Sequence, residues 1–294
     1  MRIGLQMPIF SFAEDGNLKG WIKDIAQTAD ENNFYSLWMM DHFFQLGMWL
    51  GPPEEPMLEG YSTLGYFAGI TERVKLGLMV GGVIYRTPGL LVKTVTTIDV
   101  LSGGRTYFGI GAAWYDFEAK SLGFPFPSTK IRFEMLEETL KIAHKMWSDD
   151  NSPFNGVHYQ LEKPMCNPQP TSRPHPPVLI GGMGEKKTLC FVAQYGDACN
   201  LHSRDVPYDV LRHKLDVLKQ HCDDVGRPYE EIEKTTLYTV DSEFDKTDVS
   251  NIINKFTELS ELGFQHIIIN FEHDYSVKDV ERIGREVIPA VAEL

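Results

Sequence analysis

Short apolar runs rich in β-forming residues alternate along the chain with stretches in which apolar residues recur every three or four positions. Eight of the short runs are typical of strands. They cover Arg2 to Pro8, Ser36 to His42, Val74 to Gly81, Thr106 to Ala112, Pro177 to Gly182, Asp197 to His202, Glu233 to Asp241 and Phe264 to Phe271. Their centres are continuously apolar, which is typical of parallel strands buried on both faces.

The stretches between these runs predict helices with one buried stripe. The stripes are Leu18, Ile22, Ile25 and Ala29; Phe133, Leu136, Leu140, Ala143 and Trp147; Leu211, Leu215, Leu218 and Cys222; and Val277, Val280, Ile283, Val287 and Val291. Ser276 followed by Asp279 favours a helix start, and Gly263 favours a helix end. Eight strand–helix pairs predict an α/β fold, a (β/α)8 TIM barrel, as a single domain over residues 1–294.

Two segments depart from this alternation. Residues 43–60 carry three prolines after the second strand, and residues 149–176 carry six as an insertion before the fifth strand. The insertion contains a hairpin-like piece in which the pair Asn155-Gly156 is typical of a two-residue turn. Barrels keep their active sites at the carboxyl ends of the strands, so we expect both segments to wall a pocket.

The excess of acidic over basic residues disfavours nucleic acids and anionic membranes as partners. Twenty-eight Lys and Arg stand against forty-one Asp and Glu, a formal charge of −13, and such a surface repels nucleic-acid backbones and anionic lipid. The longest nearly apolar stretch, Gly77 to Tyr85, has nine residues, whereas roughly 20 span a bilayer. The first residues lack the apolar segment of a signal peptide, so we expect a cytoplasmic protein. The four cysteines have no CxxC spacing and are expected to be buried thiols.

The carboxyl ends of parallel strands meet at one mouth of a barrel, so side chains at these ends are the candidates for chemistry. By this argument the mouth holds Gln6, Asp41, His42, Val80, Gly81, Ala112, Ala113, Gly181 to Gly184, His202, Asp241, Glu272, His273 and Asp274.

The most distinctive feature at the mouth is the run Gly181-Gly182-Met183-Gly184. We expect a helix to follow it from Glu185 to Tyr195. Glycines let backbone N–H groups approach a ligand closely, and a helix N-terminus favours negative charge, so the run predicts a phosphate cradle. A flexible turn is the alternative interpretation.

Asp41 and His42 place a carboxylate and an imidazole side by side at the end of the second strand. The first can hold a polar edge of a ligand and the second can move a proton near neutral pH, so we interpret both as catalytic. An ion pair with a loop cap is the alternative. A hypothesis from another class is a metal-dependent TIM-barrel hydrolase, whose ligands would be Asp41, His42, His202, His273 and Asp274.

Several motifs occur together along the first 200 or so residues. They are Leu37 to His42, Leu76 to Val80, Tyr85-Arg86-x-Pro88, Ile98 to Arg105, Gly109 to Trp114, Gly181 to Gly184 and Tyr195 to Asn200. In combination they resemble the bacterial luciferase-like monooxygenase family, and within it the branch of oxidoreductases that depend on the deazaflavin coenzyme F420.

The resemblance implies a (β/α)8 barrel with the ring of coenzyme F420, or alternatively of FMN, at the C-terminal mouth. In relatives, the third strand carries a bulge with a non-proline cis peptide under the ring. The resemblance also implies a homodimer, and it places His42 beside the redox centre. It assigns cofactor binding to Asp41, Met79, Val80, Ala112, Gly181, Gly182, Met183 and Gly184.

Two departures from the family pattern bear on the cofactor. Ala113 stands where many relatives carry glycine, which leaves less room beside the ring. The sequence also has no obvious basic cluster for the polyglutamate tail of F420, which favours FMN. The primary hypothesis is hydride transfer between a small organic substrate and the (deaza)flavin, with His42 as the acid–base group and Asp41 orienting it or the ring. A non-catalytic flavin binder is a further alternative.

Overall fold

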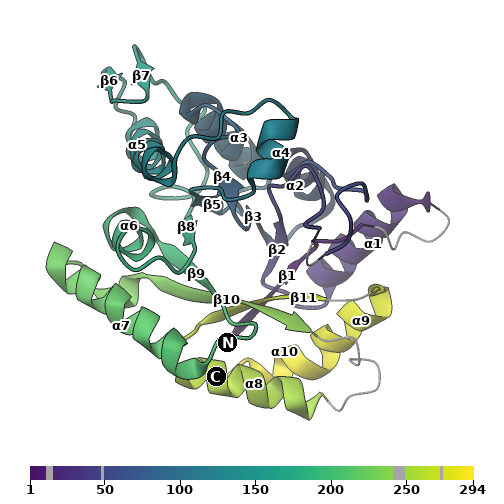
Figure 1. The fold of residues 1–294 in the computed structure, drawn as a ribbon. Helices are drawn as coiled ribbons and strands as arrows, with labels where there is room; N and C mark the ends of the chain where they lie inside the picture. Colours follow the sequence, from purple (N-terminus) through teal and green to yellow (C-terminus); the bar gives the residue numbers. More distant parts are fainter. Residues whose placement is uncertain (11–15, 48–49, 241–248, 272–273) are drawn as a thin grey trace.

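The computed structural model describes residues 1–10, 16–47, 50–240, 249–271 and 274–294, which form a parallel β-barrel surrounded by helices (Figure 1). The predicted (β/α)8 barrel is confirmed. Its strands are β1 (Arg2–Gln6), β2 (Ser36–Met39), β3 (Lys75–Leu78), β4 (Gly81–Gly82), β5 (Phe108–Gly111), β8 (Val178–Gly181), β9 (Ala198–His202), β10 (Glu233–Val240) and β11 (His266–Phe271). The third predicted strand is divided into β3 and β4.

All strand pairs in the barrel are parallel, in the order β3-β2-β1-β11-β10-β9-β8-β5-β4. The barrel closes between β3 and the residues that lead into β5. There Leu76 bridges Thr106, and the N–H of Tyr107 donates to the Leu76 carbonyl at 2.7 Å. The carboxyl ends of all the strands therefore lie at one mouth.

The helices occupy the positions that the apolar stripes predict. They are α1 (Leu18–Glu31), α2 (Gly60–Ile70), α3 (Pro88–Leu101), α4 (Asp116–Ser121), α5 (Thr129–Trp147), α6 (Thr188–Tyr195), α7 (Tyr208–Val225), α8 (Ser250–Glu261), α9 (Val277–Arg282) and α10 (Ile288–Val291), with a π-helical turn at Ile283–Val287 and a 3-10 turn at Tyr229–Glu231. Ser276 and Asp279 form the predicted capping box. In the described part of the chain, no helix is both long enough and apolar enough to cross a membrane.

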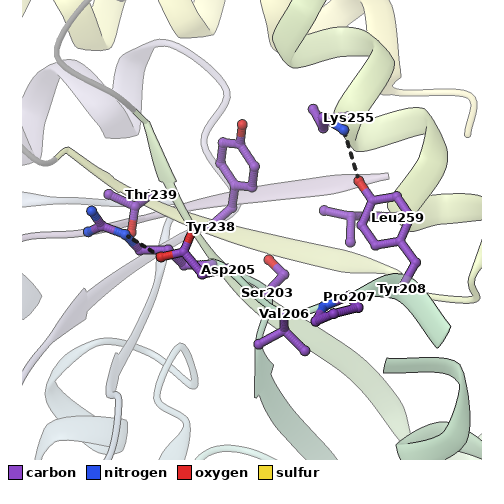
Figure 2. A pocket seen from close by; sticks show the side chains of 10 residues that line it. Ser203, Asp205, Val206, Pro207, Tyr208, Tyr238, Thr239, Lys255 and Leu259 are labelled. Carbon is purple, nitrogen blue, oxygen red and sulfur yellow. Dashed lines mark hydrogen bonds and ion pairs between the residues drawn. The ribbon is translucent and has the colours of Figure 1, made fainter. Parts of the chain in front are cut away.

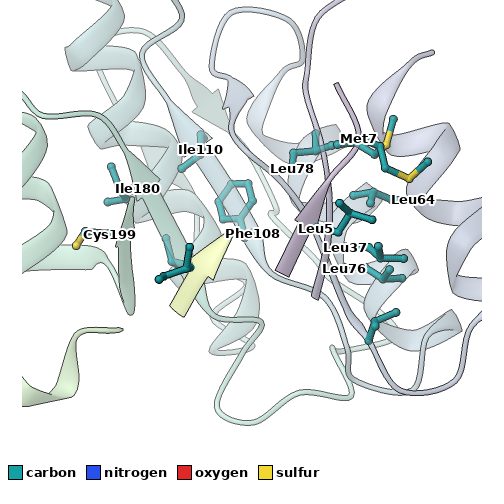
Figure 3. Packing of buried hydrophobic residues seen from close by; sticks show 14 of the residues in the cluster. Leu5, Met7, Leu37, Leu64, Leu76, Leu78, Phe108, Ile110, Ile180 and Cys199 are labelled. Carbon is teal, nitrogen blue, oxygen red and sulfur yellow. The ribbon is translucent and has the colours of Figure 1, made fainter. Parts of the chain in front are cut away.

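The outward faces of the strands build the main hydrophobic core against these helices. Figure 3 shows Leu5, Leu37 and Leu76 from three neighbouring strands on the side of Leu64, which belongs to α2. Phe108 and Ile180 continue this layer under the other helices. Because both faces of each strand are covered, the continuous apolar runs in the sequence are explained.

The largest side chain in the barrel interior is Trp38, which is fully buried and packs with Tyr107, Leu179, Ala198 and Ile268. A Cβ on Gly77 would lie 2.4 Å from the Cζ3 atom of this indole. A Cβ on Gly4 would lie 2.2 Å from Ser36 Oγ and 3.1 Å from the indole Nε1. The ring fits because β1 and β3, the two neighbours of β2, both carry glycine at its level.

A buried polar network closes the opposite, N-terminal end of the barrel. Ser36 Oγ lies 2.9 Å from His266 Nε2, and His266 Nδ1 lies 3.0 Å from a Glu233 oxygen. Tyr107 donates to the other Glu233 oxygen at 2.8 Å, and Arg2 pairs with the same carboxylate at 3.0 Å. Burial lowers the pKa of His266 despite its hydrogen bond to Glu233, which favours a neutral imidazole bridging the two partners.

The insertion before the fifth barrel strand forms a small antiparallel pair, β6 (Phe154–Asn155) and β7 (Gln160–Leu161). The expected two-residue turn at Asn155-Gly156 is wrong, because Asn155 pairs with Gln160 and the loop covers residues 156–159. The carboxylate of Glu138 on α5 accepts hydrogen bonds from the loop; the donors are the N–H groups of Val157, His158 and Tyr159, at 2.6, 3.0 and 2.9 Å.

We expect Gly77→Ala to destabilise the protein by about 1–3 kcal/mol, because the added methyl group meets a rigid buried indole and overpacks the interior. Urea unfolding measures the change. Gly89→Ala is the matched control, since its Cβ would have an ordinary contact of 3.8 Å with Leu161 in the first turn of α3. That variant should equal or slightly exceed the wild type in stability. Equal stability of Gly77→Ala and Gly89→Ala would contradict the packing argument.

Candidate active site

The third strand is interrupted at the mouth, between the end of β3 at Leu78 and the start of β4 at Gly81. The Met79–Val80 peptide bond in this interruption is cis, as the resemblance implied. Gln6 Nε2 donates to the Met79 carbonyl at 3.4 Å, and Asn270 Nδ2 donates to Gln6 Oε1 at 2.9 Å. Side chains from β1 and β11 thus hold the peptide from inside the barrel.

Glycines on the neighbouring strands make room for this interruption. A Cβ on Gly109 would lie 1.8 Å from the Leu78 carbonyl oxygen. A Cβ on Gly111 would lie 3.0 Å from Val80 Cγ2, and one on Gly181 would lie 2.8 Å from Val80 Cγ1. Val80 therefore packs directly against the first glycine of the predicted phosphate cradle.

Asp41 is buried at the mouth and both of its oxygens are occupied. Arg86 donates to them in a bidentate pair, both bonds at 2.9 Å, and the Gly82 N–H donates to Oδ2 at 2.9 Å. Arg86 also bonds to Glu59, the N-cap residue of α2. Burial raises the pKa of Asp41, while Arg86 and the Gly82 N–H act in the opposite direction. Asp41 therefore fixes the end of the third strand rather than presenting a free carboxylate.

His42 contacts a carboxylate that we did not predict. Its Nδ1 lies 2.8 Å from Oε1 of Glu118, which is fully buried on α4. Asp41 was expected to orient either His42 or the cofactor ring; the first alternative is wrong, because Glu118 bonds to Nδ1 of His42, and the second stays a prediction. Tyr85 donates to the same Oε1 at 2.6 Å, and the N–H groups of Phe43 and Phe44 donate to Oε2 at 2.6 and 3.2 Å.

The four donors around Glu118 indicate which nitrogen of His42 faces the carboxylate as a donor. Burial raises the pKa of Glu118, but the hydrogen bonds from His42, Tyr85 and Phe43 outweigh this and the pKa lies below its ordinary value. An ionised carboxylate only accepts hydrogen bonds, so the His42 proton is on Nδ1. In the neutral ring, Nε2 then carries the lone pair, and no described residue bonds to it. His42 retains its interpretation as an acid–base group.

The glycine turn lies on the same rim. Gly182 is exposed with φ +119°, a backbone conformation that requires glycine, and its N–H donates to the Asn200 carbonyl at 3.1 Å. Within the described ranges, the N–H groups of Met183, Gly184 and Glu185 have no hydrogen-bond acceptor. Three adjacent unpaired N–H groups are a suitable anion cradle.

The helix after this turn begins at Thr188 and not at Glu185 as we expected. The Leu189 N–H donates to the Gly184 carbonyl at 3.0 Å, which makes a wide turn before α6. The Glu185 carboxylate is directed to α7, where it pairs with Lys214 and, at 3.3 Å, with His213. The acidic side chain beside the cradle is therefore compensated.

The segment after β5 has a left-handed residue at Ala113, with φ +58°. This conformation costs a non-glycine residue about 1 kcal/mol. The preceding carbonyl of Ala112 accepts from the buried guanidinium of Arg132 at 2.9 Å. The glycine that the family resemblance implies at position 113 would adopt this backbone without that cost, and in this chain Ala113 adopts it beside the bond from Arg132.

The described residues among the ligands proposed for a metal-dependent hydrolase, Asp41, His42, His202 and Asp274, do not form a metal site. Asp41 and His42 are bonded to other groups, His202 is exposed at the end of β9, and Asp274 is exposed. Asp241, Glu272 and His273 lie outside the described residues. In the rest of the chain, no three His, Cys, Asp or Glu side chains are placed to hold a metal ion.

A crevice of about 660 Å³ opens at another part of the rim, between β9, β10, α7 and α8 (Figure 2). Its charged side chains are paired, Arg204 with Asp205 at 3.6 Å and Lys255 with Glu258 at 3.0 Å. It contains neither His42 nor the glycine turn.

Sequence reasoning missed Glu118, and it assigned no role to Tyr85 or Arg86. Tyr85 and Arg86 belong to the run Tyr85-Arg86-x-Pro88, and this motif was the feature of the sequence that could have indicated them. Glu118 had no local signal except its place on a short helix after the fourth barrel strand.

We expect Glu118→Gln to destabilise the protein by about 3 kcal/mol at pH 7, because one end of the amide presents N–H groups to donors. The pKa of Glu118 is lowered in the folded state, so its contribution is complete above the unfolded value of about 4.3 and is lost as the pH falls. As the pH is lowered from 7 to 4, the free energy of unfolding in urea should therefore fall less in Glu118→Gln than in the wild type. Glu31→Gln, at an exposed position on α1, should match the wild type at each pH; the same result for Glu118→Gln would show that the buried carboxylate does not hold this junction together.

A family model described as luciferase-like monooxygenase matches residues 1–249. An F420-dependent glucose-6-phosphate dehydrogenase of Kineococcus radiotolerans is 26% identical over 222 residues, which cover 74% of this chain and 62% of the relative. An FMNH2-dependent dimethylsulfone monooxygenase of Pseudomonas putida is 31% identical over 96 residues, 33% of this chain and 26% of that protein. The chain spans about half the length of the first curated relatives that it matches.

The fold is also similar to that of a solved F420-dependent secondary alcohol dehydrogenase in complex with an F420-acetone adduct. The TM-score is 0.83 at 19% identity, and the match covers 99% of this chain and 98% of that one. The family model extends over most of the sequence and includes the interrupted third strand, His42 and the glycine turn, so the chain belongs to the luciferase-like monooxygenase family.

Proposed function

We propose that this protein is an oxidoreductase that transfers a hydride between a small organic substrate and coenzyme F420, with FMN as the alternative cofactor. One observation carries the proposal: the glycine turn with its unpaired N–H groups and the imidazole of His42 lie on one rim, linked through Val80, Gly82 and Asp41. The same mouth thus has N–H groups that could bind a phosphate and a side chain that could transfer a proton.

The cofactor's phosphate fits the residues of the turn. A side chain at Gly182 would need a backbone conformation that other residues rarely adopt, and a Cβ at Gly184 would lie 2.9 Å from Thr188 Oγ1. The N–H groups of Met183, Gly184 and Glu185 would hold the anion. We place the ring over the Met79–Val80 peptide beside Ala112, with Asp41 acting through Gly82.

His42 would move the proton that accompanies the hydride. When bound, a deazaflavin or flavin ring supplies the acceptor or donor for two electrons and one hydrogen. For a carbinol substrate, Nε2 takes the hydroxyl proton while the carbon–hydrogen bond breaks and the carbonyl forms; the reverse reaction returns the proton from the imidazolium. Glu118 accepts the hydrogen bond from Nδ1–H of His42, and its negative charge stabilises the positive charge that develops on the imidazole.

Relatives named for F420 and for FMNH2 are both found, so each cofactor has support from the family. An absorbance spectrum of the protein reconstituted with each cofactor separates a deazaflavin from a flavin. The homodimer and the cytoplasmic location expected from the sequence stay predictions.

We expect Gly182→Asp to weaken binding of F420 or FMN by at least about tenfold, because a carboxylate would face the phosphate in a strained turn. Fluorescence titration measures the dissociation constant. Gly226→Asp is the matched control: it adds the same charge at φ +71° in the C-cap of α7, and it should leave the constant unchanged. Equal affinity in the wild type and Gly182→Asp would remove the phosphate assignment.

We expect His42→Gln to lower kcat by about 10²–10⁴-fold, because the glutamine keeps a hydrogen bond to Glu118 but cannot accept the substrate proton. Stopped-flow absorbance of the cofactor measures the rate. Cofactor affinity should stay within about twofold of the wild type, since His42 is not part of the phosphate cradle. A variant with undiminished turnover would eliminate His42 as the proton-transfer group.

A further inference from the structure

We propose that the substrate group presented to His42 is uncharged and apolar or aromatic, and that it binds on a shelf formed by Phe44, Trp114, Tyr115 and Phe117. This inference rests on the proposed function for the chemistry at His42, and it adds the class of molecule on which that chemistry acts.

The shelf begins at His42 itself. The Trp114 ring lies 5.6 Å from the imidazole, centroid to centroid, at 72°, and the Tyr115 ring lies 5.8 Å from it at 73°. Trp114 and Tyr115 are stacked at 5.2 Å. Phe117 follows at 5.9 Å from Tyr115 and reaches Phe44 at 6.0 Å. The rings form a continuous apolar surface that leads away from the acid–base group.

Much of this surface faces solvent. Trp114 is 52% exposed and Phe117 is 51% exposed, although large aromatic side chains are usually buried in a monomer. Contiguous apolar patches of this kind mark binding sites. Here the patch adjoins the one histidine whose Nε2 we assign to proton transfer, so a substrate bound on it would present its reactive group to His42.

The charges around His42 disfavour an anionic substrate. Arg86 is held by Asp41 and Glu59, and His42 is held by Glu118. On α4, Lys120 pairs with Asp116 at 2.7 Å. Each of these three basic groups already has a carboxylate partner, which favours an uncharged group over a phosphate or carboxylate at the shelf. In this respect we expect the protein to differ from its relatives named glucose-6-phosphate dehydrogenases.

Two neutral ketones that differ only in one ring test the inference. We expect acetophenone to bind at least about tenfold more tightly than acetone, since a buried phenyl ring contributes more than about 1.4 kcal/mol. Isothermal titration measures both constants, with and without bound F420. Trp114→Ala should weaken acetophenone binding about tenfold and leave acetone and F420 unchanged. Leu101→Ala, which removes an apolar side chain 66% exposed on α3, should change none of the three.

The outcomes separate this inference from the proposed function. Loss of F420 and FMN binding in the wild type would overturn the proposed function whatever the ketones do. Equal affinity for acetophenone and acetone, or tighter binding of glucose 6-phosphate than of either, would overturn the substrate class. If Trp114→Ala instead converts a dimer to a monomer in sedimentation, the shelf is an interface between copies of the chain, and the inference is also wrong.

Discussion

The mouth of the barrel depends on a steric constraint at the end of the third strand. The chain between Leu78 and Gly81 leaves the regular ladder, and it can do so only because the adjacent strand has no side chain at Gly109. The same displacement puts Val80 between Gly111 and Gly181. Any larger residue at these positions would push the strands apart. The shape of the site therefore depends mainly on the glycines at positions 109, 111 and 181, which leave room for the displaced strand.

Hydrogen bonds and ion pairs to two buried carboxylates then hold the polar side chains at the mouth in place. Asp41 and Glu118 are buried carboxylates, and each is saturated by donors from different parts of the chain. A buried carboxylate without partners would destabilise the fold, whereas each of these two carboxylates is paired and connects several segments of the chain. Asp41 joins the second and third strands, and Glu118 joins α4 to the loop that carries His42. Among the described residues, the imidazole of His42 keeps one ring nitrogen, Nε2, without a recorded partner, as the proposed proton-transfer role needs.

The sequence predicted the parts of this arrangement that depend on local pattern. The eight strands follow from apolar runs, and the glycine turn follows from three glycines at a strand end. The pairing of His42 with Glu118 could not be found in this way, because 76 positions separate them and Asp41 is the nearer carboxylate in the chain. The loop 156–159 shows the same limit: Asn155-Gly156 favours a tight turn locally, but the N–H groups of Val157, His158 and Tyr159 bond to Glu138 on the preceding helix α5, about 20 positions away. The start of α6 was misplaced for a related reason, since the side chain of Glu185 is drawn toward α7.

The interior packing also decides which end of the barrel can bind a ligand. At the N-terminal end, Ser36, His266 and Glu233 are hydrogen-bonded in the order of a hydrolytic triad, and such geometry alone would suggest a nucleophile. Ser36 and His266 are fully buried, however, and Trp38 fills the barrel above them. The indole Nε1 also donates to Ser36 Oγ at 2.7 Å, so the serine hydroxyl is occupied within the packed interior, and we interpret the network as structural. Above Trp38, toward the C-terminal end, the described residues include glycines and the amide side chains of Gln6 and Asn270. The unpaired N–H groups of the glycine turn lie on the rim at this same end, so among the described residues the hydrogen-bonding groups that could hold a ligand lie here and not in the network around Ser36.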